Sequence, residues 1–323
     1  MWEIILWILL FFGSYFIIFF AADFFIDNLK DVCLIFKLSP FIIGMLVLGI
    51  DPEESIASIV AALNGLPYIS MGNVIGNSII AMTLPFALPL FVKRFIFKSP
   101  TKFYFIILYF LMFIIVLGFI FNYMLSISGI IALAGYFIYL IRNVKYHKKE
   151  AETETKILDN EIEFNDEGLE ELKHASKIKK IIFIIIGLTF VFLGGELLVI
   201  SAENLITLLN IPEIFFGSVI IGFVTNAEEI TLVIKSIQKK SVEIGFGGMI
   251  GKLIWNLTIT FGVSGIIIMN MSFNWILIMN WIILIGIIIF FNIFSRAGKL
   301  ERRDGILLFT VFLFFILLNS LFL

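Results

Sequence analysis

Long apolar runs, broken by short polar or charged turns, dominate the sequence. A bilayer core about 30 Å thick needs roughly 17 to 25 apolar residues as helix. Ten runs of this length cover residues 4–26, 40–63, 69–92, 103–121, 125–141, 181–200, 214–237, 247–269, 275–294 and 306–323. The pattern therefore predicts an all-α polytopic membrane protein with ten transmembrane helices.

The positions of the basic residues test this number of spans independently. Short cytoplasmic loops collect Lys and Arg, whereas external loops do not. All 23 Lys and Arg residues except Lys252 fall in or at the edges of alternate loops when ten spans are drawn with both termini outside. We therefore expect a multi-pass protein of the cell membrane, with its termini outside and its 145–180 loop in the cytoplasm.

That loop divides the chain into two halves of five spans each. An odd number of spans per half means that the second half enters the membrane inverted relative to the first. We expect a first five-helix repeat at 1–144, a cytoplasmic linker at 145–180 and a second repeat at 181–323. The linker is strongly acidic, which favours a solvated and largely flexible segment, with a regulatory cation sensor as the alternative.

Composition narrows the class of function. Hydrophobic residues make up 60% of the chain and charged residues 15%, against about 45 to 50% and about 25% in soluble domains. A soluble enzyme is excluded, and a net charge of -2 offers no basic field for nucleic acid. The sequence shows no nucleophile–base pair and no cluster of histidines for a metal, so we expect neither an enzyme nor a resident cofactor.

The two halves resemble one another in sequence. With a constant offset of 173 residues, Asp23 matches Glu196 and Gly44 matches Gly217. After the first half is shortened by two residues, Glu53-Glu54 match Glu228-Glu229, and Gly72 to Asn77 match Gly247 to Lys252. Inverted repeats of this kind place a substrate site near the bilayer midplane, where each half contributes a broken helix.

The second and seventh spans carry acidic clusters at mid-membrane depth, in residues 49–54 and 224–229. Carboxylates in a bilayer cost several kcal/mol unless they are paired, protonated or in contact with water, so they indicate function. Neighbours on a helix point about 100° apart, and only one Glu of each pair can face a site. Pro52 removes a backbone donor and so frees carbonyls that can coordinate a cation. Hydrogen bonds that merely stabilise the helices are the alternative.

The third and eighth spans add polar residues beside small ones. These are Asn73, Asn77, Ser78, Asn256 and Thr258. Hard cations such as Ca²⁺ and Na⁺ prefer oxygen ligands of this sort, which favours a cation transporter. Gly72 and Gly76, taken alone, are equally typical of a helix packing face.

At this point the chain resembles the cation/calcium exchanger superfamily, over essentially its whole length. In the sodium/calcium branch, a motif Glu is followed after 18 residues by a G-N-x-I-G-S stretch. Here Glu54 is followed at that spacing by Gly72-Asn73-Val74-Ile75-Gly76-Asn77, and Glu229 by Gly247-Gly248-Met249-Ile250-Gly251-Lys252.

The resemblance implies a role for individual residues. Glu54 and Glu229 match the paired cation-binding glutamates, and Thr225 matches a threonine that lines the ion site. In the acidic motifs, the chain departs from the family pattern with Asp51 and Asn226 at the serines and with Ile50 at a threonine. In the third and eighth spans, it has Asn77 and Lys252 at the family's serines, and Ala81 and Asn256 at the polar ligand one turn later.

The function implied is a cation antiporter that moves Ca²⁺ or another cation against Na⁺ or H⁺ by alternating access, with the first and sixth spans sliding or rocking across the bundle. Its partners would be inorganic cations and the lipid bilayer. Because Lys252 replaces a calcium ligand, an exchanger of monovalent cations and protons is the alternative. A non-transporting membrane scaffold or sensor also stays open.

Lys252 permits two interpretations. Its ammonium would point at Glu229 or Glu54 and occupy the position of a bound cation, which would repel a divalent ion. Alternatively, because Lys252 lies only about 10 Å along its helix, its long stem would snorkel to the cytoplasmic surface.

Overall fold

The computed structural model describes residues 2–35, 52–92, 94–96, 102–158, 171–226, 229–230, 233 and 242–321. Asp51, Gly44 and Glu228 lie outside these ranges, so the expectations that concern them stay predictions. The described chain is almost entirely helical, as predicted.

The principal helices before the acidic linker are α1 (Trp2–Ile35), α3 (Pro52–Leu63), α4 (Pro67–Leu90), α5 (Lys102–Ile120) and α6 (Leu125–Leu158). Those after it are α7 (Glu171–Leu209), α8 (Glu213–Phe215), α9 (Gly222–Thr225), α11 (Val242–Trp255), α12 (Phe261–Ile268), α13 (Trp275–Ala297) and α14 (Arg302–Ser320). Two π-helical segments, η3 (Phe216–Ile221) and η4 (Asn256–Thr260), and a 3₁₀ turn, η1 (Asn122–Met124), connect them.

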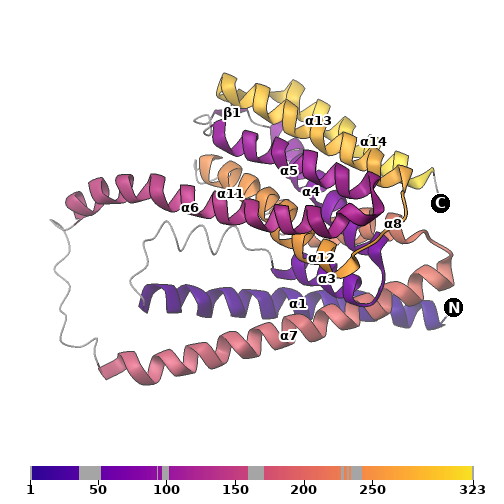
Figure 1. Cartoon of the computed structure of the whole chain (residues 1–323), viewed down its shortest axis with the longest axis horizontal. Helices are drawn as coiled ribbons and strands as arrows, with labels where there is room; N and C mark the ends of the chain where they lie inside the picture. The colour runs from indigo at the N-terminus through magenta and orange to yellow at the C-terminus, as the bar shows by residue number, and fades with distance from the viewer. Residues whose placement is uncertain are drawn as a thin grey trace.

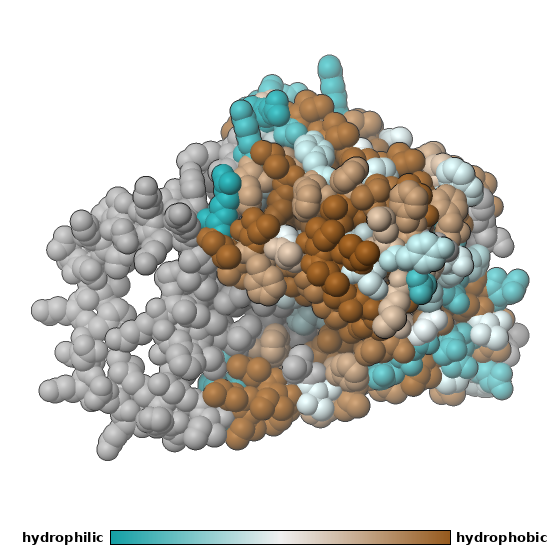
Figure 2. Space-filling view, viewed as in Figure 1, coloured by the Kyte–Doolittle hydropathy of each residue, from teal (hydrophilic) through white to brown (hydrophobic). Residues whose placement is uncertain are grey.

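Eight helices of the described residues are long and apolar enough to cross a membrane. The second and seventh predicted spans are the ones represented by shorter helices, α3 and the stretch Glu213–Thr225. Apolar residues cover much of the middle of the visible face, whereas hydrophilic ones gather mainly towards its edges (Figure 2). This is the surface that a bilayer requires, and the chain is a multi-pass membrane protein.

The prediction of a largely flexible linker is wrong for its two ends. The α6 helix continues to Leu158, and α7 already begins at Glu171. These extensions are rich in Glu, Lys and Ala, which favour a helix in water as well as in a membrane. Only 159–170 of the linker lie outside the described residues.

A short sheet joins two loops far apart in the sequence. The strand β1 (Phe95–Ile96), after α4, pairs antiparallel with β2 (Lys299–Leu300), between α13 and α14. Phe95 and Leu300 face each other and are both buried. The pairing is a small exception to the all-α prediction, and it brings the loops at one end of the bundle together.

The helices form two groups with separate cores. The long helices α1 and α7 lie side by side along one flank (Figure 1), and their side chains form one apolar cluster, to which α3 contributes. The larger cluster fills the space among α4, α5, α6, α11, α13 and α14. Gly187 and Gly194 of α7 allow close approach to α1, since a Cβ at Gly194 would meet Ile18.

The α4 helix passes through the centre of the molecule and crosses η3 at backbone contact. A Cβ at Gly76 would collide with the carbonyl group of Ser218, and one at Gly217 with the carbonyl oxygen of Ile69. Gly72 faces the Ser218 hydroxyl in the same way. The packing role of Gly72 and Gly76 is therefore confirmed, and the crossing holds the third span against the seventh.

Candidate cation site

Both acidic motifs lie where a helix begins or ends. The α3 helix begins at Pro52, the position at which a missing backbone N–H costs least, so Glu53 and Glu54 occupy its first turn. The positive end of a helix dipole favours a carboxylate there. On the other side of the site, α9 ends at Thr225, and Asn226 leaves helical geometry.

Glu54 is fully buried, and polar groups surround its carboxylate. Its Oε1 accepts a hydrogen bond from the Asn77 amide and lies 2.8 Å from Lys252 Nζ. Its Oε2 accepts from Asn256 Nδ2 at 3.3 Å. Glu54 thus faces the polar side chains of α4 and of the α11–η4 segment.

Lys252 bridges the two halves of the protein. Its ammonium donates to Glu229 Oε1 and forms the ion pair with Glu54, and only 6% of the residue is exposed. The snorkelling interpretation is therefore wrong: the side chain points into the protein, where two buried carboxylates attract it more strongly than the surface does.

Amide side chains connect the remaining members of the site. Asn77 Nδ2 also donates to Thr225 Oγ1 at 2.7 Å, and Asn226 Nδ2 approaches the Asn77 carbonyl oxygen at 3.4 Å. Asn256 Nδ2 approaches Asn77 Oδ1 at 3.3 Å. The structure thus brings together Glu54, Glu229, Asn77, Thr225, Asn226, Asn256 and Lys252 of the predicted set, whereas Asp51 lies outside the described residues.

Several buried oxygens of this region accept no hydrogen bond from the described residues. They are the Oδ1 atoms of Asn73, Asn226 and Asn256. A buried acceptor without a donor is costly, and amide oxygens are ligands that Na⁺ and other hard cations use. The donor set is therefore chemically suited to a cation.

A second group of polar residues supports the site, and of its members the sequence had indicated only Asn73. Ser55 accepts from Trp255 Nε1 at 2.8 Å and shares a hydrogen bond of 2.7 Å with Thr260. Asn73 donates to Ser58 at 2.8 Å and to the Glu54 carbonyl oxygen at 3.3 Å. Adjacency to Glu54 is a sequence signal for Ser55.

Thr258, which the sequence had indicated in the eighth span, is fully buried in η4. Its hydroxyl donates to the Ile254 carbonyl oxygen of its own helix at 2.6 Å. The π-helical turn η4 changes the direction of the residues that follow Trp255, and Thr260 instead reaches Ser55. A π-bulge at such a place is common in functional sites.

Comparison with known proteins covers both halves of the chain. The family described as "Sodium/calcium exchanger protein" matches residues 6–145 and 179–321. An uncharacterized membrane protein of Methanocaldococcus jannaschii is 25% identical over 304 residues, which are 92% of each protein. A putative antiporter, CaxA, of Alkalimonas amylolytica is 25% identical over 76% of each.

Solved structures of the sodium-calcium exchanger NCX_Mj have a similar fold. The form soaked with 10 mM Na⁺ and 10 mM Sr²⁺ superposes with a TM-score of 0.61 at 23% identity, and the match covers 96% of this chain and 97% of that one. A form soaked with 100 mM Na⁺ and 10 mM Sr²⁺ gives 0.60 at 24% identity. These matches establish that the fold is that of a helical membrane exchanger.

Proposed function

Because this chain belongs to the sodium/calcium exchanger protein family, whose members are cation antiporters and not enzymes, we propose that it exchanges a monovalent cation for protons. The observation that carries this proposal is the Lys252 ammonium held between Glu54 and Glu229. A positive charge of the protein itself then occupies the place that the family gives to a ligand of the transported ion.

Charge supports this choice of substrate. With Glu54 and Glu229 ionised and Lys252 positive, these three groups carry one net negative charge, which one monovalent cation or one proton neutralises. A bound Ca²⁺ ion would leave the buried site with one excess positive charge, and the Lys252 ammonium would repel the Ca²⁺ ion. At about 4 Å, two unit charges interact by about 4 kcal/mol even at an effective dielectric constant of 20. Binding of a divalent ion is therefore strongly disfavoured.

Alternating access fits the division of the helices into two groups. The pair α1 and α7 packs on α3, α4 and η3 through one apolar cluster, and it can slide or rock along this apolar surface against the bundle that holds the site (Figure 1). Exchange, rather than leak, follows because an empty site leaves buried charge uncompensated, and that charge opposes crossing without a bound cation.

Calcium exchange is the second candidate, and Asp51 favours it. Both Asp51 and Lys252 stand at positions where the family has serines. An added acid and an added base leave the formal charge of the motif positions unchanged. If Asp51 compensates Lys252, the site keeps the charge that a Ca²⁺ ion requires, as expected of a relative of a sodium-calcium exchanger.

Ion flux into liposomes separates the candidates. Purified protein in vesicles with a Na⁺ or K⁺ gradient should move protons, detected with an enclosed pH dye, and should take up no ⁴⁵Ca²⁺ above the level of empty vesicles. Uptake of ⁴⁵Ca²⁺ driven by a Na⁺ gradient would instead establish calcium exchange. The absence of every coupled flux would contradict antiport and favour a scaffold or sensor.

The orientation in the cell membrane is part of the proposal. The sorting of basic residues places both termini outside and the 145–180 loop in the cytoplasm. In a Cys33→Ser background, we expect a membrane-impermeant maleimide to label Asn122→Cys in intact cells and Glu161→Cys only after permeabilisation. The reverse pattern would invert the topology.

A further inference from the structure

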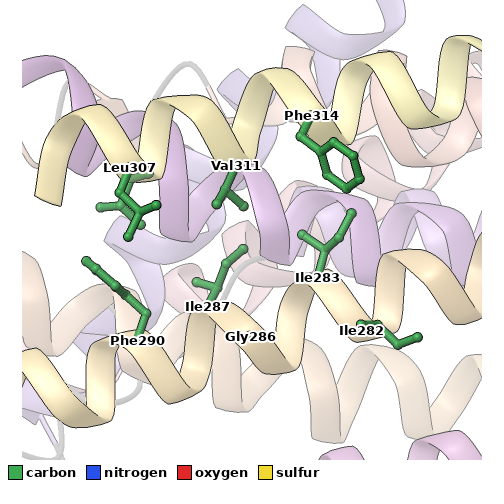
Figure 3. A pocket seen from close by; sticks show the side chains of 9 residues that line it. Ile282, Ile283, Gly286, Ile287, Phe290, Leu307, Val311 and Phe314 are labelled. Carbon is green, nitrogen blue, oxygen red and sulfur yellow. The ribbon is translucent and has the colours of Figure 1, made fainter.

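A continuous apolar groove separates α13 from α14 on the outside of the bundle. Its volume is about 280 Å³, and its lining consists of Ile282, Ile283, Gly286, Ile287, Phe290, Leu307, Leu308, Val311 and Phe314. In Figure 3, side chains from both helices point into the space between them. The groove extends for about 12 Å along α13, from Ile282 to Phe290, at 1.5 Å per residue.

Gly286 forms part of the floor of this groove. A Cβ placed there would meet nothing within 4 Å, so the space above it is open. The face around the groove is also apolar and exposed, since Ile282 is 48% exposed, Ile293 58% and Phe314 54%. Such a face on two candidate spans contacts the hydrocarbon of the bilayer, and the groove is therefore open to lipid chains.

A basic cluster lies just beyond one end of these two helices. It comprises Arg94, Arg296, Lys299, Arg302 and Arg303, which the β1–β2 pairing brings together from two loops. Within the described part of the chain, the four arginines make no ion pair with a carboxylate, and all four are exposed. They can therefore bind an anion from outside the protein.

Two acidic residues lie among these bases, and both have partners in the protein. Glu301 and Asp304 cap the first turn of α14 through a reciprocal capping box. Lys299 donates to Glu301 at 2.8 Å, and this hydrogen bond lowers the pKa of the Glu301 carboxyl. The bases still outnumber the acids, so the end of the groove is positively charged.

The spacing links the cluster to the groove. Arg303 precedes Leu307 by one helical turn, which places it on the same face of α14, about 6 Å along the axis from the nearest lining residue. A ligand that fits this arrangement has an anionic headgroup, which the basic cluster can bind, and an attached hydrocarbon chain, which the apolar groove can bind.

We propose that this site binds an anionic phospholipid, with the phosphate on the arginines of the basic cluster and an acyl chain in the groove between α13 and α14. The lipid would link the last two spans to the loop after α4. The proposal does not depend on which cation the protein exchanges.

Native mass spectrometry tests this binding directly. The purified protein is taken from vesicles of equal parts phosphatidylglycerol and phosphatidylcholine, and retained lipid is quantified for each variant. Wild type should retain phosphatidylglycerol selectively. Arg302→Gln/Arg303→Gln should retain about 25-fold less, since each basic residue near an anionic lipid contributes roughly a factor of five. Gly286→Phe should reduce retention at least about tenfold by filling the floor of the groove.

Matched controls test the placement. Lys102→Gln removes a basic residue at the start of α5, and Ile289→Phe enlarges an exposed apolar side chain that does not line the groove; both should leave retention unchanged. Equal retention of the two lipids by wild type would overturn the proposal. So would equal loss in the controls, binding of soluble glycerol phosphate as tight as that of the lipid, or a protein dimer that Gly286→Phe dissociates.

Discussion

Glu54→Gln and Glu229→Gln are each expected to abolish exchange while leaving a folded protein. Either change removes one of the two carboxylates that face Lys252, so the three groups lose their net negative charge and no longer attract a cation. At an effective dielectric constant of 20, the attraction between one carboxylate and a cation about 4 Å away is about 4 kcal/mol, so its loss corresponds to roughly a thousandfold loss of cation affinity. Initial rates of exchange in liposomes measure the effect.

Glu53→Gln is the matched control for the first of these variants. It alters the neighbouring carboxylate in the same helical turn, whereas the hydrogen bonds from Asn77 and Asn256 belong to Glu54. We expect it to keep most of the exchange activity. If Glu53→Gln were the more damaging change, the register of the second span and the match between Glu54 and Asn77 would both be wrong.

Hydropathy was sufficient to predict most of the transmembrane helices, because the bilayer imposes their length. It placed the span 275–294 within α13 and the span 103–121 almost on α5. It could not predict that α1 continues to Ile35 or that α6 continues to Leu158, because a helix that leaves the membrane loses its apolar signal but keeps its hydrogen bonds. The π-turns η3 and η4 have no compositional signal either.

The centre of the site could be predicted because a carboxylate in a membrane requires an explanation. Charge alone singled out Lys252 and the two Glu-Glu pairs, and the internal repeat placed these pairs at corresponding positions. The resemblance to the exchanger family then indicated Glu54 and Glu229 within the pairs. Ser55 and Thr260 were missed, because a hydroxyl in an apolar helix usually bonds its own backbone, as Thr258 does. Whether Lys252 reaches the site depended on three-dimensional packing, which no spacing rule provides.

Lys252→Ser is expected to turn a site that rejects calcium into one that binds it. The change restores the residue type of the family motif. It also makes the site more negative, from one net negative charge to two, and a single Ca²⁺ neutralises two. Removal of the ammonium relieves a repulsion of at least about 4 kcal/mol, so Ca²⁺ affinity should increase roughly a thousandfold. Uptake of ⁴⁵Ca²⁺ into liposomes should appear with it.

Two further variants separate charge from geometry. Lys252→Arg keeps the positive charge and should bind Ca²⁺ as poorly as wild type. Lys252→Met removes the charge but provides no oxygen ligand, so its Ca²⁺ affinity should increase less than that of Lys252→Ser. Because Lys252→Ser leaves two buried carboxylates without their cation, its melting temperature should be lowered and should recover as Ca²⁺ is added.

In the proposed mechanism, the Lys252 ammonium takes the place of a transported cation between Glu54 and Glu229. Isothermal titration of Ca²⁺ into wild type and Lys252→Ser, at equal pH and free of Na⁺, tests it most directly. Wild type should give no measurable heat of Ca²⁺ binding, whereas Lys252→Ser should bind one Ca²⁺ ion saturably. Tight Ca²⁺ binding by wild type, unchanged in Lys252→Ser, would contradict this mechanism.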